Sequence, residues 1–148
     1  MATYFRSVSR ETVIVGVEPT GAISLAAALV AGGPVTLDRI DPFVDGAAVK
    51  RIGALGHRAM ADLDASVTAH PVLDEVRAET TAHTPVRILP DEPVSLPAGS
   101  AHITHVDEGA ICTTMLELYQ NEGIIAEPAG ALAVTGLSQL KLPDDAVV

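Results

Sequence analysis

The stretch GVEPTGA at residues 16–22 has a near repeat in IAEPAGA at residues 125–131. In both copies an apolar run ends on a glutamate, a proline follows, and small residues come next. Proline suits the first turn of a helix because the amide hydrogen that it lacks would have no partner there. Each copy therefore predicts a strand, a glutamate at its carboxyl end, and a helix.

The two glutamates, Glu18 and Glu127, are candidate site residues. Ligands of open α/β sheets bind outside the carboxyl ends of the strands. If both strands belong to one parallel sheet, both carboxylates leave it at the same edge. The alternative is that each carboxylate only stabilises the N-terminus of its own helix. The spacing leaves both interpretations open.

The other elements are expected to alternate between strand and helix. The β-branched run TVIVGV at 12–17 is typical of a strand buried on both faces. AHITHV at 101–106 alternates like a strand, and residues 124–126 supply a last one. Helices are expected over 23–31, over 54–64 and from Pro128 onward. This order indicates the α/β class with a parallel sheet.

One further helix is expected between Asp107, which can cap it, and Gly123, which ends it. Ile111, Met115 and Leu118 recur at helical spacing and predict a single buried stripe. Cys112, on the same helix, is expected to be a small buried hydrophobe.

The region from 65 to 100 is the least regular part of the chain. It carries five prolines and mixed charge. We expect a helix over 72–80, a strand over 86–89 and surface loop elsewhere. The sequence thus predicts one domain over residues 1–148 with a divergent, loop-rich insertion at 65–100.

Composition narrows the class of protein. The chain has 148 residues, of which 48% are hydrophobic and 3% aromatic, so Ala, Val, Leu and Ile must build the core. Its net charge of −10 argues against nucleic acid and anionic membranes as partners. One cysteine excludes an internal disulfide and favours the cytoplasm. No apolar run approaches the length of a membrane span.

Histidines and lysines offer no catalytic pattern of their own. His102 and His105 are three residues apart, which on a strand points their rings to opposite faces and makes a poor metal site. We expect both at the surface. Of the two lysines, Lys50 and Lys141, Lys50 is expected to form a salt bridge, because a Schiff-base lysine needs a desolvated setting. The remaining histidines are His57, His70 and His83.

Three blocks of the chain resemble a known family. They are residues 2–34, residues 35–53 with the phrase PFVDGAAVKRIG, and residues 107–140. Together they resemble the biosynthetic threonine dehydratases (threonine ammonia-lyases), which are fold-type-II pyridoxal-phosphate enzymes. The resemblance implies a three-layer fragment of a tryptophan synthase β-like domain. It also implies the family's reaction, which is dehydration and deamination of L-threonine to 2-oxobutanoate and ammonia in isoleucine biosynthesis.

The resemblance also implies roles for individual residues. It places the backbone of Asp45, Gly46 and Ala47 beside the cofactor ring, with Glu127 near it. Glu18 and the carbonyl of Ala22 correspond to a cation site in serine racemase-like relatives. Ser24 stands where those relatives have a further acid, and Lys50 matches a lysine that is not catalytic.

Parts of the family's cofactor site have no counterpart in these residues. They are the Schiff-base lysine, the glycine-rich phosphate loop and a Ser-Gly-Gly-Asn-like strand end. We therefore expect a partial catalytic domain that does not bind pyridoxal phosphate alone, is inactive alone, and forms a homodimer or joins a complementary chain. Two alternatives are a non-catalytic interaction module that completes a sheet with itself or a partner, and a remnant without present function.

Overall fold

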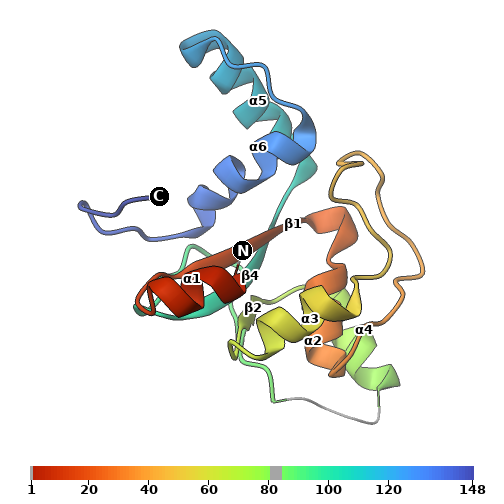
Figure 1. Ribbon diagram of the computed structural model, residues 1–148. Coiled ribbons are helices and arrows are strands. Elements are labelled where there is room, and N and C mark those ends of the chain that lie inside the picture. The colour runs from red at the N-terminus through yellow and green to blue at the C-terminus, as the bar shows by residue number, and fades with distance from the viewer. Residues whose placement is uncertain (1, 81–84) are drawn as a thin grey trace.

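The computed structural model describes residues 2–80 and 85–148 of the chain. In this part, the strands form one parallel sheet in the order β1-β4-β2-β3 (Figure 1). Their bounds are Ile14–Pro19 for β1, Ser66–Thr68 for β2, Ile88–Leu89 for β3 and Ala101–Val106 for β4. The α/β class and the parallel sheet are confirmed.

Helices cover both faces of the sheet, which gives three layers (Figure 1). Helices α2, α3 and α4 lie on one side, and α6 packs against β1 on the other with α5 beside it. The bounds are Ala2–Val8 for α1, Ser24–Ala31 for α2, Ala54–Ala61 for α3, Pro71–Glu79 for α4, Glu108–Glu122 for α5 and Pro128–Thr135 for α6. Two 3₁₀ turns span Thr20–Ala22 and Gly136–Gln139.

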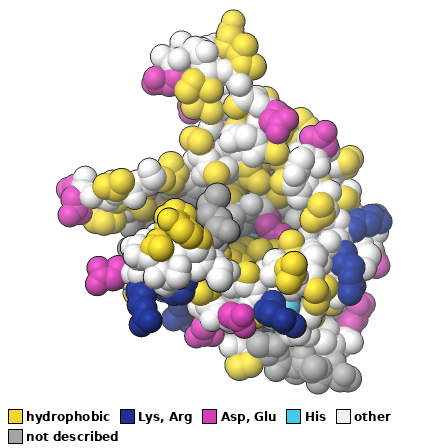
Figure 2. All heavy atoms as spheres, in the orientation of Figure 1, with side chains coloured by type: hydrophobic (Ala, Val, Ile, Leu, Met, Phe, Trp, Pro, Cys, Tyr) yellow, Lys and Arg dark blue, Asp and Glu magenta, His cyan; other side chains and the backbone are white. Residues whose placement is uncertain are grey.

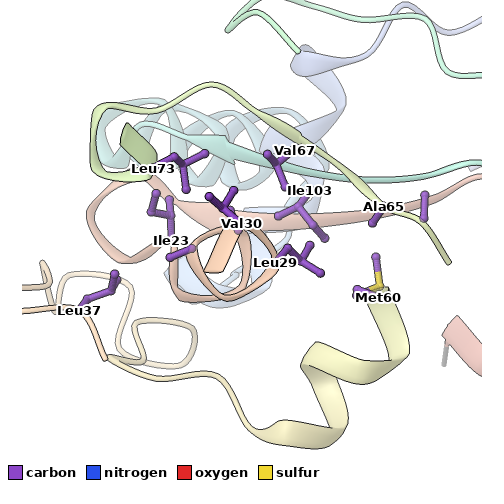
Figure 3. Close-up of a cluster of buried hydrophobic side chains, with 12 residues drawn as sticks. Ile23, Leu29, Val30, Leu37, Met60, Ala65, Val67, Leu73 and Ile103 are labelled. Atoms are coloured by element: carbon purple, nitrogen blue, oxygen red, sulfur yellow. The ribbon is translucent and has the colours of Figure 1, made fainter. Parts of the chain in front are cut away.

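The larger core surrounds α2, which is buried along almost its whole length. Figure 3 shows Val30 of α2 beside Val67 and Ile103 of the sheet, with Leu29 directed towards Met60 of α3. An apolar helix with no polar face is stable only when it is enclosed. The small residues of SLAAALVA let the neighbouring elements approach it closely, as the composition indicated.

The smaller core joins α5 and α6 to the other face of the sheet through Val44, Val106, Ile111, Ala131 and Leu132. Of the predicted stripe on α5, Ile111 is fully buried, while Met115 and Leu118 are half-buried. The far end of α5 projects from the body, and Figure 2 shows hydrophobic side chains exposed on it. The prediction that Cys112 is buried was wrong, because it lies on the open side of this projecting helix.

The second copy of the glutamate-proline pattern, at residues 125–131, differs from the predicted strand, glutamate and helix. The strand predicted over 124–126 was wrong, because this segment has no strand beside it in residues 2–80 and 85–148. The signals on either side of it were right. Gly123 ends α5 in the left-handed conformation with φ of 67°, and α6 begins at Pro128.

The region 65–100 contains more of the sheet than expected. The predicted helix and strand are confirmed as α4 and β3. The prediction of surface loop at Ser66–Thr68 was wrong, because these residues form β2, which is fully buried between β4 and β3. Three residues are too few to show a strand's alternation in the sequence. That 65–100 is an insertion stays a prediction.

In the part of the chain that the structure describes, none of the helices combines the length and the apolar character needed to cross a membrane.

Candidate functional site

The carboxyl ends of β1 and β4 lie side by side, with Glu18 opposite His105 and Pro19 opposite Val106. The turn at 20–22 leaves β1 here, and α5 begins two residues after β4. This sheet edge therefore brings together Glu18, Thr20 and His105, as expected for a ligand site in an open α/β sheet.

Glu18 is engaged by the helix that follows it. Its Oε1 accepts a hydrogen bond from the amide of Leu25 at 2.7 Å, and its Oε2 accepts one from Ala26 at 3.0 Å. Burial raises the pKa of the Glu18 carboxyl to about 7, and the two amide hydrogen bonds act in the opposite direction. For Glu18 the geometry favours the interpretation that the carboxyl stabilises the N-terminus of its own helix.

The predicted cation site combines Glu18 with the carbonyl of Ala22. Ser24 is buried, and its hydroxyl has no hydrogen-bond partner among the described residues, which is compatible with a missing ligand. Both oxygens of Glu18, however, already accept amide hydrogen bonds. The described residues also contain no group of three His, Cys, Asp or Glu that could hold a metal ion. The cation role of Glu18 and Ala22 stays a prediction.

His102 and His105 point to opposite faces of β4, but the prediction that they lie at the surface was wrong. The Nδ1 of His102 lies 2.9 Å from the Ser66 hydroxyl, and its Nε2 lies 3.0 Å from the Thr68 hydroxyl. Burial lowers the pKa of His102. The partners come from β2, so a sequence interpretation that placed β2 in a loop could not anticipate them.

His105 joins three elements at the sheet edge. Its Nδ1 lies 3.2 Å from the Thr20 hydroxyl, and its Nε2 lies 3.1 Å from the carbonyl of Ala69. A carbonyl only accepts, so Nε2 donates. The ring of His70 packs edge-on at 4.9 Å, and its Nδ1 accepts from the amide of Val72 to cap α4. Burial lowers the pKa of His70, and the neighbouring His105 adds to that effect. His57 is half-buried, and His83 lies outside the described residues.

The residues predicted to face the cofactor ring meet in space. The turn that carries Asp45, Gly46 and Ala47 lies against the start of α6. A Cβ added to Gly46 would lie 2.8 Å from the Cβ of Ala129 and 3.9 Å from Oε1 of Glu127. Glu127 is exposed and makes no side-chain capping bond to α6 within the described residues. Its carboxylate is therefore not committed to its own helix, in contrast to Glu18.

The resemblance places these residues at one wall of a pyridoxal-phosphate site, and that role stays a prediction. Gly46 lets the turn pack closely against α6, since an added Cβ would lie 2.8 Å from the Cβ of Ala129. Lys50 does not fit the role of the imine-forming lysine, because it is exposed and its Nζ donates to the carbonyl of Asp38 at 2.9 Å. The predicted salt bridge of Lys50 was also wrong, because within the described residues its amine contacts this main-chain carbonyl and no carboxylate. Lys141 is exposed as well.

Two features of the site were missed by the sequence interpretation. The amide of Gly21 donates to Oε1 of Glu108 at 2.7 Å, across 87 positions of sequence. A cleft of about 360 Å³ also lies between the 20–21 turn, the 35–39 loop and α4, with Asp38, Arg39, Glu75 and Glu79 among its lining residues. Both depend on long-range contacts, which leave no local pattern.

No family model matches the chain. Solved structures define its class. The processed form of threonine deaminase isoform 2 from Solanum lycopersicum superimposes with a TM-score of 0.62 at 25% identity, over 93% of this chain and 30% of that one. A threonine deaminase from T.th. gives a TM-score of 0.60 at 20% identity, over 92% of this chain and 34% of its own, and shows the shared fold. The chain thus has the α/β fold of a threonine deaminase segment.

Comparison of sequences gives a more specific result than comparison of folds. The chain is 41% identical to L-threonine dehydratase biosynthetic IlvA of Corynebacterium glutamicum, over 100% of its own length and 26% of the relative. For the Mycobacterium leprae protein of the same name the identity is 43%, over 27% of that relative. The chain is therefore similar to one segment of these threonine dehydratases and spans about a quarter of the length of the curated relatives it matches, which confirms the resemblance found in its motifs.

Proposed function

We propose that this chain is the part of a threonine dehydratase catalytic domain that lines one side of the bound pyridoxal phosphate. The complete site eliminates water from L-threonine to give 2-oxobutanoate and ammonia. The observation that supports this most strongly is the identity of 41% to 43% with biosynthetic threonine dehydratases over all 148 residues. The meeting of the 45–47 turn with Glu127 agrees with it.

The residues of this wall position the cofactor ring and shield it from water. They do not form the covalent bond to the cofactor. Pyridoxal phosphate supplies the electron sink for the substrate carbon that loses its proton. Gly46 lets the 45–47 turn pack against α6 beside Glu127, because a side chain there would collide with Ala129. Glu127 offers a carboxylate that can accept a hydrogen bond beside the ring. In the complete site, other residues supply the lysine and the phosphate cradle.

The cation role of Glu18 and Ala22 stays a prediction and is not part of this proposal. The buried Ser24 hydroxyl supports it, and the amide bonds to Glu18 weigh against it. The expected location is the cytoplasm, where a chain with one cysteine needs no disulfide.

A hybrid enzyme tests the proposal. The matched quarter of the Corynebacterium glutamicum protein is replaced by this chain, and 2-oxobutanoate formation from L-threonine is measured. We expect turnover, strongly reduced by Gly46→Ala and unchanged by Gly53→Ala, because a Cβ at Gly53 would meet only open space. A hybrid that folds and binds pyridoxal phosphate but produces no 2-oxobutanoate would contradict the proposal.

A second candidate function is that of an interaction module, and exposed apolar side chains favour it. Leu116, Tyr119, Ile124 and Ile125 on and after α5 are 54%, 60%, 50% and 87% exposed. Neighbouring apolar side chains left in water favour association. We expect the isolated chain to self-associate in sedimentation. A monomer at all concentrations, with no binding of a hydrophobic dye, would reject this function.

A further inference from the structure

Gly21, between β1 and α2, is held from two directions. Its amide donates to Oε1 of Glu108 in the first turn of α5 at 2.7 Å, and its carbonyl accepts from the amide of Asp41 at 2.9 Å. A single residue thus connects the start of α5 to the long loop that carries the 45–47 turn. Hydrogen bonds of this length to a carboxylate are stronger than those between neutral groups.

The contact requires a glycine at this position. A Cβ added to Gly21 would lie 2.7 Å from Oε1 of Glu108 and would overlap the Cβ of Asp41. Backbone and side chains therefore approach Gly21 as closely as they can. Such tight packing transmits a displacement of Glu108 to Asp41.

The connection continues from Asp41 towards the proposed cofactor wall. Oδ1 of Asp41 accepts from the amide of Phe43 at 2.8 Å. The next residue, Val44, is fully buried in the smaller core, and its carbonyl accepts from the amides of Ala47 and Ala48 at 2.8 and 2.7 Å. The geometry of the turn is thereby coupled to the position of Asp41.

Glu108 itself is fixed by its place in α5. The preceding Asp107 caps the helix, with Oδ1 accepting from Gly109 at 2.7 Å and from Ala110 at 3.3 Å. Ile111, one turn further on, is fully buried. The start of α5 is therefore anchored independently of the loop that it contacts.

We infer that Glu108 is a positioning residue, which holds Gly21 and Asp41 and thereby keeps the 45–47 turn opposite Glu127. The contacts of Gly21 with Glu108 and Asp41 do not depend on the proposed function. Their consequence for the cofactor wall rests on it. This role could not be predicted from the sequence, because Glu108 acts on the 45–47 turn, about 60 positions before it.

Hydrogen exchange in the full chain tests the positioning role directly. Glu108→Ala leaves the Gly21 amide without its acceptor, so exchange in residues 41–48 should rise by about tenfold or more. Glu108→Gln keeps an oxygen acceptor and should restore slow exchange. Glu117→Ala, an exposed glutamate on the same helix, is the matched control and should leave exchange unchanged. Unchanged exchange in Glu108→Ala, or an equal rise in Glu117→Ala, would overturn the inference.

The hybrid enzyme then tests the consequence. We expect kcat/KM for L-threonine to fall by about tenfold to a hundredfold in Glu108→Ala and to recover in Glu108→Gln, since a displacement of about 1 Å has effects of that size. Equal kinetics in the Glu108→Ala and unmodified hybrids would overturn the role at the wall. An inactive unmodified hybrid would count against the proposed function alone, because the exchange experiment decides the positioning role without turnover.

Discussion

The two copies of the glutamate-proline phrase share a sequence pattern but not a structure. In the first copy, β1 pairs with β4 from Ile14 to Pro19, and Glu18 turns inward to bond the start of α2. In the second copy the residues before Glu127 form no strand in the described chain, and Ile125 is 87% exposed. The first glutamate belongs to the fold, and the second faces the 45–47 turn.

The difference separates local signals from signals that need a neighbour. Proline at the start of a helix acts through its own backbone, so α6 begins at Pro128 without help. A strand needs a partner for its amides and carbonyls. The first copy has β4 beside it, whereas no described strand lies beside the second. Similar apolar runs therefore form a strand in the first copy and no strand in the second.

The largest expected effect comes from truncating an isoleucine near each copy. Ile23 is 2% exposed, so Ile23→Ala should lower the free energy of unfolding by about 2–5 kcal/mol through lost burial and a cavity. Ile125→Ala, at 87% exposure, should change it by less than about 0.5 kcal/mol. Urea denaturation of both variants checks this. Equal losses would mean that the second copy is as buried as the first.

Removing the charge of Glu18 should change how stability depends on pH. The pKa of Glu18 is raised from 4.5 to about 7 in the folded chain, so the folded state keeps a proton that the unfolded state releases. The free energy of unfolding should therefore fall as pH rises from about 4.5 to about 7, by up to about 3 kcal/mol relative to Glu18→Gln. Denaturation of both proteins over this range, with a chelator present, measures the difference.

Two histidines also make the stability of the folded chain depend on pH. Burial lowers the pKa of His70 and His102, so their contribution is present above pH 6.5 and is lost as pH falls below it. This is the opposite sign from Glu18. Both histidines remain in Glu18→Gln, so their contribution cancels in the comparison. A difference that does not vary with pH would show that Glu18 ionises normally.

A smaller effect on stability is expected at the residues that precede α5 and α6. Asp107 caps its helix with its side chain, and Glu127 does not. Asp107 caps α5 with its side chain, and Asp107→Ala should cost about 1 kcal/mol. Glu127 occupies the same position before α6 without a side-chain capping bond in the described structure, so Glu127→Ala should cost less than about 0.5 kcal/mol. Thermal unfolding of the two variants measures both. A cost for Glu127→Ala as large as that for Asp107→Ala would show that Glu127 does cap α6.

The sequence predicted those features that depend on local chemistry. Asp107 and Gly123 marked the ends of α5, and the β-branched run marked β1. The family resemblance named Asp45, Gly46, Ala47 and Glu127 together, and the structure brings these four residues to one place. Their role beside a cofactor stays a prediction that the hybrid enzyme tests.

What the sequence could not supply depends on contacts across the chain. β2 is three residues long, and it provides the hydroxyl groups that make a buried position acceptable for His102. Glu108 gains its partner Gly21 only because β1 and β4 end side by side. Cys112 is of a residue type that is commonly buried, but it lies exposed on a helix that extends beyond the core.

The most direct test compares the two glutamates in the hybrid enzyme with L-threonine as substrate. Glu127→Gln should lower kcat by at least about tenfold, or about 1.4 kcal/mol in activation free energy, with an unchanged melting temperature. Glu18→Gln should keep kcat within about twofold and change only the pH dependence of stability. Full turnover in Glu127→Gln, or loss of turnover in a folded Glu18→Gln hybrid, would contradict the assignment of one glutamate to the site and the other to the fold.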